Sequence, residues 1–175
     1  MSADVFAGVL PTLFRELADG APDPATRTYM LNRGDPGLLA SLDRLSAAAA
    51  SESSGGAPSI AAHVDHLRYG LNLLNRWAAG TPVPWEETDW STSWKRNAVS
   101  EEEWRVLRGD LRHEVADWMG VLASPPEADE IQAGWIAGSV VHLAYHLGAI
   151  RQLDRAARGP TAEDERQAEA ALRER

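Results

Sequence analysis

Cysteine is absent from the 175-residue sequence. The chain therefore has no thiol nucleophile, no disulfide framework and no zinc site that needs a cysteine ligand. A bound metal ion would have to use histidine, aspartate or glutamate side chains.

Basic side chains are also few. The only lysine is Lys95, and 17 basic residues face 26 acidic ones, which gives a formal net charge of −9. Such a chain repels a phosphate backbone unless its basic residues gather on one face. The arginines are scattered and form no basic run. We therefore expect no nucleic-acid partner.

Neither a secretion signal nor a membrane span is evident. Residues 1–11 show no basic region followed by an apolar stretch, and no segment approaches the length of a membrane span. We expect a cytoplasmic protein without a membrane partner. The length and ordinary composition predict one domain over residues 1–175, with a polar tail from about residue 160.

No alternating run of strand length appears, whereas apolar residues recur at the three- and four-residue steps of amphipathic helices. Helices are expected over residues 3–19, 38–45, 60–79, 101–124 and 132–158. Pro11 should kink or interrupt the first of them. Ser59 is a plausible N-cap, and Ser100 with Glu103 has the pattern of a capping box. The four long helices predict an all-α four-helix bundle.

A segment rich in proline and tryptophan separates the second and third long helices. Residues 81–100 contain Trp85, Trp90 and Trp94 but no helical period. We expect an ordered loop packed over the helices. Loop aromatics beside a pocket can form an apolar lid.

Two histidines lie four residues apart in the last long helix. The spacing of His142 and His146 places both rings on one face, within reach of a common ion. Inward-facing rings need polar partners, so the alternative is a pair of core histidines hydrogen-bonded to neighbouring helices. The spacing alone does not decide between a metal site and such a pair.

A third inward histidine comes from the helix over 60–79. His66 precedes Leu67 on the apolar stripe, and with His142 and His146 it would complete three ligands. Three neutral imidazoles with an open fourth position are typical of a catalytic metal site. For His63 we favour a place at the solvent or the rim over a role supporting the ligands.

Three segments resemble the DinB-like superfamily of metalloenzymes, and the likeness spans most of the chain. They are residues 59–67 (SIAAHVDHL), 90–95 (WSTSWK) and 142–151 (HLAYHLGAIR). The resemblance implies a four-helix bundle, often dimeric, in which His66, His142 and His146 bind nickel, zinc or a similar divalent ion. His66 matches better than His63 because the family histidine is followed directly by an apolar residue. Ala149 departs from the pattern, since the family often has glutamine there.

The resemblance implies a metal-dependent enzyme acting on a small molecule. Characterised members include S-transferases that use a low-molecular-weight thiol, mycothiol or bacillithiol, and a mycothiol-dependent isomerase. Two alternatives stay open: a small-ligand-binding or stress-related module without catalysis, and a hydrolase that activates a metal-bound water.

Other side chains have simpler interpretations. Tyr69 and Tyr145 could reach a metal, but a tyrosine on a bundle helix is more often a core aromatic with its hydroxyl at the surface. Arg68 and Arg151 could bind a carboxylate, but helix-surface arginines usually meet solvent or a nearby acid. His113 is expected to be exposed, without a role.

Overall fold

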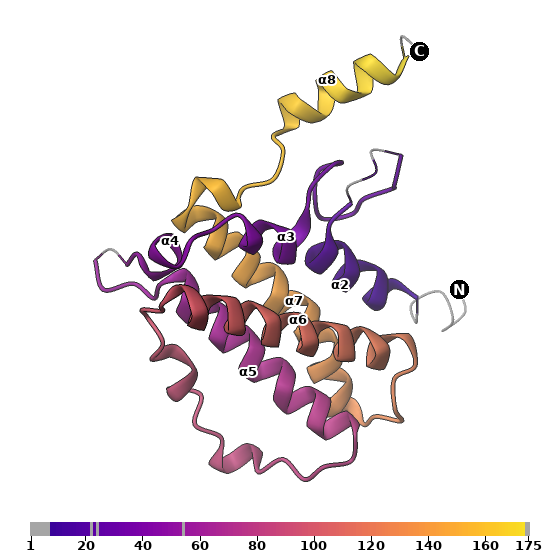
Figure 1. Ribbon diagram of the computed structural model, residues 1–175. Coiled ribbons are helices and arrows are strands. Elements are labelled where there is room, and N and C mark those ends of the chain that lie inside the picture. The colour runs from indigo at the N-terminus through magenta and orange to yellow at the C-terminus, as the bar shows by residue number, and fades with distance from the viewer. Residues whose placement is uncertain (1–7, 22, 24, 54, 174–175) are drawn as a thin grey trace.

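The structure, a computed structural model, describes residues 8–21, 23, 25–53 and 55–173. Within these residues it has seven α-helices, three short 3-10 helices and no strand, which confirms the all-α prediction for this part of the chain (Figure 1). The helices are α2 (Val9–Asp19), α3 (Gly37–Asp43), α4 (Ala47–Ser51), α5 (Ile60–Ala78), η1 (Trp85–Glu87), η2 (Thr92–Trp94), α6 (Glu101–Ala123), α7 (Glu130–Leu153), η3 (Arg155–Ala157) and α8 (Ala162–Arg173).

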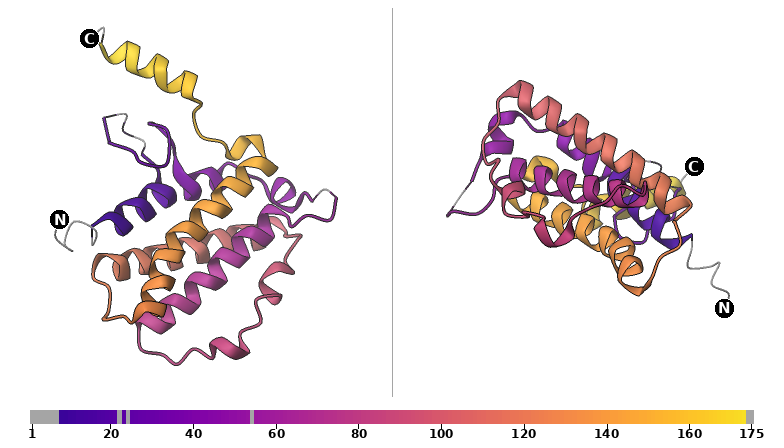
Figure 2. Two further views of the ribbon diagram at one scale, coloured as in Figure 1. Left: turned by 180° about the vertical axis from the view of Figure 1, so that it is seen from behind. Right: turned by 90° about the horizontal axis from the view of Figure 1, so that it is seen from below.

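Helices α2, α5, α6 and α7 pack around one apolar core. Both α2 and α5 contact both α6 and α7, so the four helices enclose the space between them (Figure 2). The apolar stripes expected on α6 and α7 face this core. Their buried residues are Trp104, Leu107, Leu111, Val115, Trp118 and Leu122 on α6, and Ile136, Val140, Leu143, Leu147 and Ile150 on α7.

Side-chain caps set where the long helices begin. The Ser59 hydroxyl accepts a hydrogen bond from the backbone N–H of Ala62 at 3.2 Å, as an N-cap should. Ser100 and Glu103 form the predicted capping box at the start of α6. A second capping box at the start of α7 joins residues 129 and 132, and the sequence analysis did not anticipate it. These caps fix the register of the helices that carry the histidines.

Several details of the helices differ from the prediction. Pro11 lies in the first turn of α2, where its missing N–H removes no intrahelical bond, so it does not interrupt the helix. Residues 3–7 of that predicted helix lie outside the described residues. Helix α4, over Ala47–Ser51, was not predicted. Helix α7 ends at Leu153 rather than 158, because the chain turns at Asp154 into η3.

Helix α7 is more apolar than the sequence analysis allowed. Among the described helices it alone is long and apolar enough to cross a membrane, with a mean hydropathy of 1.2 over an 18-residue window. This corrects the expectation that no segment approaches the length of a membrane span. The finding is weak evidence for a membrane, because core helices of water-soluble proteins pass the same test, and α7 packs against α2 and α5.

The polar tail forms α8 (Ala162–Arg173), which extends away from the four packed helices (Figures 1 and 2). The segment leading to it is tied to the body where the Asn32 amide donates to the Pro160 carbonyl at 2.8 Å.

Candidate metal centre

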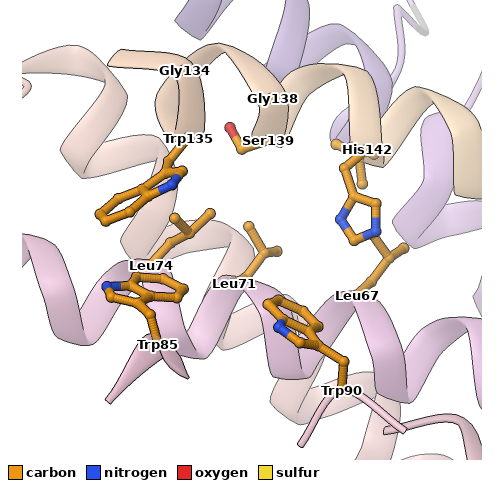
Figure 3. A pocket seen from close by; sticks show the side chains of 12 residues that line it. Leu67, Leu71, Leu74, Trp85, Trp90, Gly134, Trp135, Gly138, Ser139 and His142 are labelled. Carbon is orange, nitrogen blue, oxygen red and sulfur yellow. The ribbon is translucent and has the colours of Figure 1, made fainter. Parts of the chain in front are cut away.

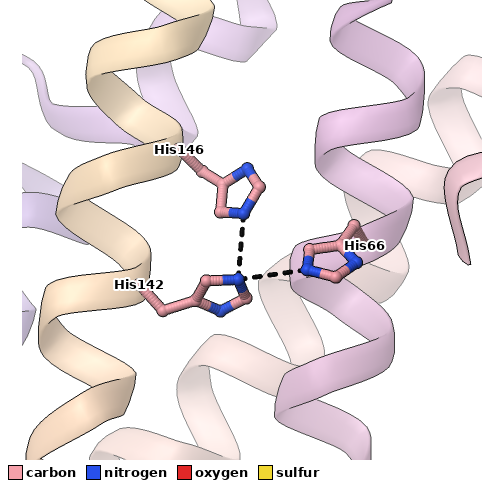
Figure 4. Close-up of side chains that lie close together, drawn as sticks. All are labelled: His66, His142 and His146. Carbon is pink, nitrogen blue, oxygen red and sulfur yellow. Dashed lines mark hydrogen bonds between the residues drawn. The ribbon is translucent and has the colours of Figure 1, made fainter. Parts of the chain in front are cut away.

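Helices α5 and α7 lie side by side and bring three histidines together (Figure 4). The Nε2 atom of His142 lies 3.1 Å from Nε2 of His66 and 2.9 Å from Nε2 of His146. One ligand nitrogen from each residue lies within 4.8 Å of the other two. His66 and His146 are buried, and His142 is half-buried. The structure thus gathers the three predicted residues, and their binding of an ion stays a prediction.

The loop between α5 and α6 sets the protonation of His66. Ser93 Oγ lies 2.8 Å from Nδ1 of His66 and donates its own proton to the Trp90 carbonyl at 2.7 Å. A hydroxyl has only one proton, so Ser93 must accept from the Nδ1–H of His66. In the neutral ring Nε2 then carries the lone pair, as a metal ligand requires.

His63 lies inside the protein, which corrects the expectation of a solvent or rim position. It is 7% exposed, and its Nδ1 lies 2.8 Å from Nδ1 of His146. The ring is enclosed because Trp94 packs edge-on against it, with ring centroids 5.3 Å apart. When His146 donates in this bond, its Nε2 carries a lone pair directed at the other two rings. His63 therefore occupies the position that the supporting role, ranked second in the sequence analysis, would require.

The cluster also has a consistent set of hydrogen bonds without an ion. With lone pairs on Nε2 of His66 and His146, one Nε2–H on His142 can serve both neighbours. Binding of an ion at the same point would release that proton and use three lone pairs. The geometry therefore suits a metal site, and the same contacts link the three buried rings and the half-buried His142 when no ion is bound.

Burial holds the four rings in the neutral form. It lowers the pKa of His63 and of His142 below 6.5. Burial, together with the nearby His142 and His63, lowers the pKa of His66 to about 4. Burial, together with His142, His63 and His66, lowers the pKa of His146 to about 2. At neutral pH all four are uncharged, which is the state that coordinates a metal.

A cavity of about 400 Å³ adjoins the cluster at His142 (Figure 3). Trp85 and Trp90 line it, as the lid prediction requires, together with Trp135 of α7. Trp94 is not among its lining residues: it stacks on His66 instead, with ring centroids 4.2 Å apart. Trp85 and Trp90 thus border the cavity, while Trp94 covers the histidines.

The weaker candidates have structural partners. Arg68 pairs with Asp65 at 2.9 Å, and Arg151 pairs with the buried Asp35 at 2.6 Å. Each arginine thus meets a nearby acid, as the sequence analysis favoured. Tyr145 is 67% exposed rather than in the core, although its ring lies edge-on to His146 with centroids 5.1 Å apart. His113 and its acidic partner on the next turn of α6 are exposed, as expected.

The chain has no significant match among protein-family models, curated proteins or solved structures. The likeness to the DinB-like superfamily therefore rests on the quoted motifs, which the all-helical fold and the three-histidine cluster accompany.

Proposed function

We propose that the protein is a metal-dependent enzyme of the DinB-like type, with one divalent ion on His66, His142 and His146. The observation that carries the proposal is the convergence of three Nε2 atoms from neutral rings. In two of these rings the other nitrogen, Nδ1, is held by a hydrogen bond: that of His66 by Ser93 and that of His146 by His63. Three protein ligands leave a fourth position for a reactant, as in catalytic sites. Nickel and zinc both accept imidazole ligands.

Bound there, a divalent ion would lower the pKa of a thiol or a water molecule at its open position. Trp94 shields the His66 ring from solvent, and the cavity beside His142 offers room for the second reactant. In thiol S-transfer, the sulfur of an external low-molecular-weight thiol forms a bond to an electrophilic carbon. The leaving group departs with its electron pair, and the thiol proton passes to solvent. A chain without cysteine must take such a thiol from outside.

Cobalt loading tests this function, because cobalt(II) commonly replaces zinc and absorbs when a thiolate binds it. We expect one ion per chain, a thiolate-to-cobalt absorption on adding mycothiol or bacillithiol, and metal-dependent S-alkylation of that thiol. His142→Ala should lose all three. The exposed His113→Ala variant serves as the control. A full complement of metal without turnover of any thiol would contradict the transferase.

The second candidate is a binding module without catalysis. The observation that favours it is the hydrogen-bond network, which links the four histidines without an ion. Metal-free protein that stays folded and binds an apolar ligand would support the module. Metal-dependent hydrolysis of an ester or amide, without thiol transfer, would support the hydrolase instead.

We also propose that the chain is a homodimer that pairs through the outer face of α7. On this face the large apolar residues Ile131, Val141 and Tyr145 are 68%, 69% and 67% exposed. Twofold pairing would cover such an apolar face. We expect light scattering to give a mass of twice the 19.0 kDa chain mass for the wild type. Val141→Arg should give the mass of a single chain. Val106→Arg, at an exposed site on α6, should leave the dimer intact. A monomeric wild type at micromolar concentration would contradict the proposal.

A further inference from the structure

The cavity beside His142 has no charged side chain in its wall. In Figure 3 the indole rings of Trp85 and Trp135 stand at the end away from His142, and Trp90 lies nearer to it. The wall consists of Leu67, Gly70, Leu71, Leu74, Trp85, Trp90, Gly134, Trp135, Gly138, Ser139, His142 and Leu143. Its volume of about 400 Å³ is that of a small-molecule site.

Three helix-interior glycines keep the cavity open. Gly70 of α5 and Gly134 and Gly138 of α7 line it. A glycine inside a helix costs about 1 kcal/mol relative to alanine. A β-carbon at Gly134 or Gly138 would meet no atom within 4 Å. These glycines therefore lower the stability of the helices at positions where larger side chains would fit. Larger side chains there would narrow the cavity.

The one hydroxyl group in the wall is committed elsewhere. Ser139 donates to the Ile136 carbonyl at 2.7 Å and accepts from the Trp118 indole N–H at 2.8 Å. Apart from the indole N–H groups, the remaining polar group is His142, whose Nε2 belongs to the histidine cluster. A ligand would thus meet apolar and aromatic surface along most of its length and a polar centre at one end.

We propose that this cavity binds a flat, uncharged aromatic group of the substrate, whose reactive atom points toward His142. The direction of that atom rests on the proposed function, whereas the binding of the aromatic group does not. No charged side chain lines the cavity, so a charged group buried there would lack a counter-charge, at a cost in free energy. An aromatic cage for a quaternary ammonium is not formed either: Trp85 and Trp135 pack on each other at 4.5 Å, and Trp90 packs against Tyr69 and His66.

Titration calorimetry with three probes of one shape tests the chemical class. We expect 2-naphthol to bind, and 2-naphthoate and 2-naphthyltrimethylammonium to bind at least about tenfold more weakly, because no side chain of opposite charge lines the cavity. Equal or tighter binding of either charged probe would overturn the proposal. So would failure of 2-naphthol to bind.

Two variants locate the binding in this cavity. A β-carbon at Gly70 would lie 3.5 Å from Trp90 and 3.8 Å from His142, which are ordinary contacts, so Gly70→Leu should fill the space and weaken 2-naphthol binding at least about tenfold. Trp85→Ala, in the loop, should do the same by removing a wall. Gly109→Leu on α6, where a β-carbon also meets nothing within 4 Å, is the matched control. Unchanged binding in both cavity variants would overturn the proposal.

Two further measurements separate the cavity from the metal. His146→Ala, which removes a proposed ligand outside the cavity wall, should keep 2-naphthol binding even though metal binding is lost. 2-Naphthalenethiol should bind metal-loaded protein at least about tenfold more tightly than metal-free protein, because its sulfur would reach the ion. Equal affinity of this thiol for the two forms of the protein would overturn the proposal that the reactive atom of the substrate points toward His142. Absence of metal in wild-type protein would instead overturn the proposed function and leave the aromatic site standing.

Discussion

His66→Ala is expected to weaken divalent-metal binding by orders of magnitude, whereas His63→Ala should weaken it by about 10- to 100-fold. The first change removes one of three nitrogens directed at a common point. The second removes only the group that holds Nδ1 of His146 at 2.8 Å. Ser93→Ala should resemble His63→Ala, because it removes the hydroxyl that holds Nδ1 of His66.

Competition with a chromophoric chelator measures these affinities on one scale. His113→Ala provides the baseline, since that ring is exposed on α6, outside the cluster. Circular dichroism on each variant confirms that the helices are retained. If His63→Ala abolishes binding while His66→Ala does not, then the ligand set is wrong although the helical fold stands. If no variant changes the affinity, the ion binds elsewhere.

Acid is expected to destabilise the metal-free protein by several kcal/mol between pH 6.5 and pH 4. A histidine in the unfolded chain titrates near pH 6.5, whereas burial and its neighbours lower the pKa of His66 to about 4. Between these two pH values the unfolded chain binds more protons, so the free energy of unfolding falls as the pH falls. For His66 alone the effect is on the order of 3 kcal/mol. His146, whose pKa is lowered further, acts in the same direction.

Urea unfolding at pH 7 and at pH 4.5 measures this effect. Carboxylates titrate in the same range, so the informative quantity is the difference between wild type and His146→Leu. The variant should lose less stability on acidification, because it has one fewer buried imidazole to protonate. His113→Leu should behave like wild type. An identical pH dependence of His146→Leu and wild type would show that the cluster does not resist protonation.

Periodic features of the sequence predicted much of the fold. The apolar stripes on α5, α6 and α7 identify the buried faces because helix geometry repeats every 3.6 residues. The same periodicity places His142 and His146 on one face of α7. The Ser59 cap and the capping box at Ser100 located two helix starts correctly. These inferences depend on local geometry, which the sequence carries directly.

Features that depend on distant contacts were not predictable in this way. His63 is buried because residues of the loop over 81–100 fold back across α5, and nothing in the spacing of His63 and His66 indicates this. The role of Ser93 has the same origin, since a loop serine has no period from which to infer its partner. The cavity depends on which residues of α5, α7 and the loop line the space between them, and the sequence does not show this. In each case the missing information was the path of the loop or the packing of two helices.

One short stretch of the loop touches both halves of the site. Trp90 forms part of the cavity wall, and its carbonyl accepts the proton of Ser93, which in turn holds the His66 ring. A ligand that moves Trp90 would thus change how firmly His66 is oriented. Coupling between two binding equilibria is reciprocal, so an ion that tightens His66 would alter the affinity for the aromatic group by the same factor. Occupancy of one site would then report on the other through residues 90–93.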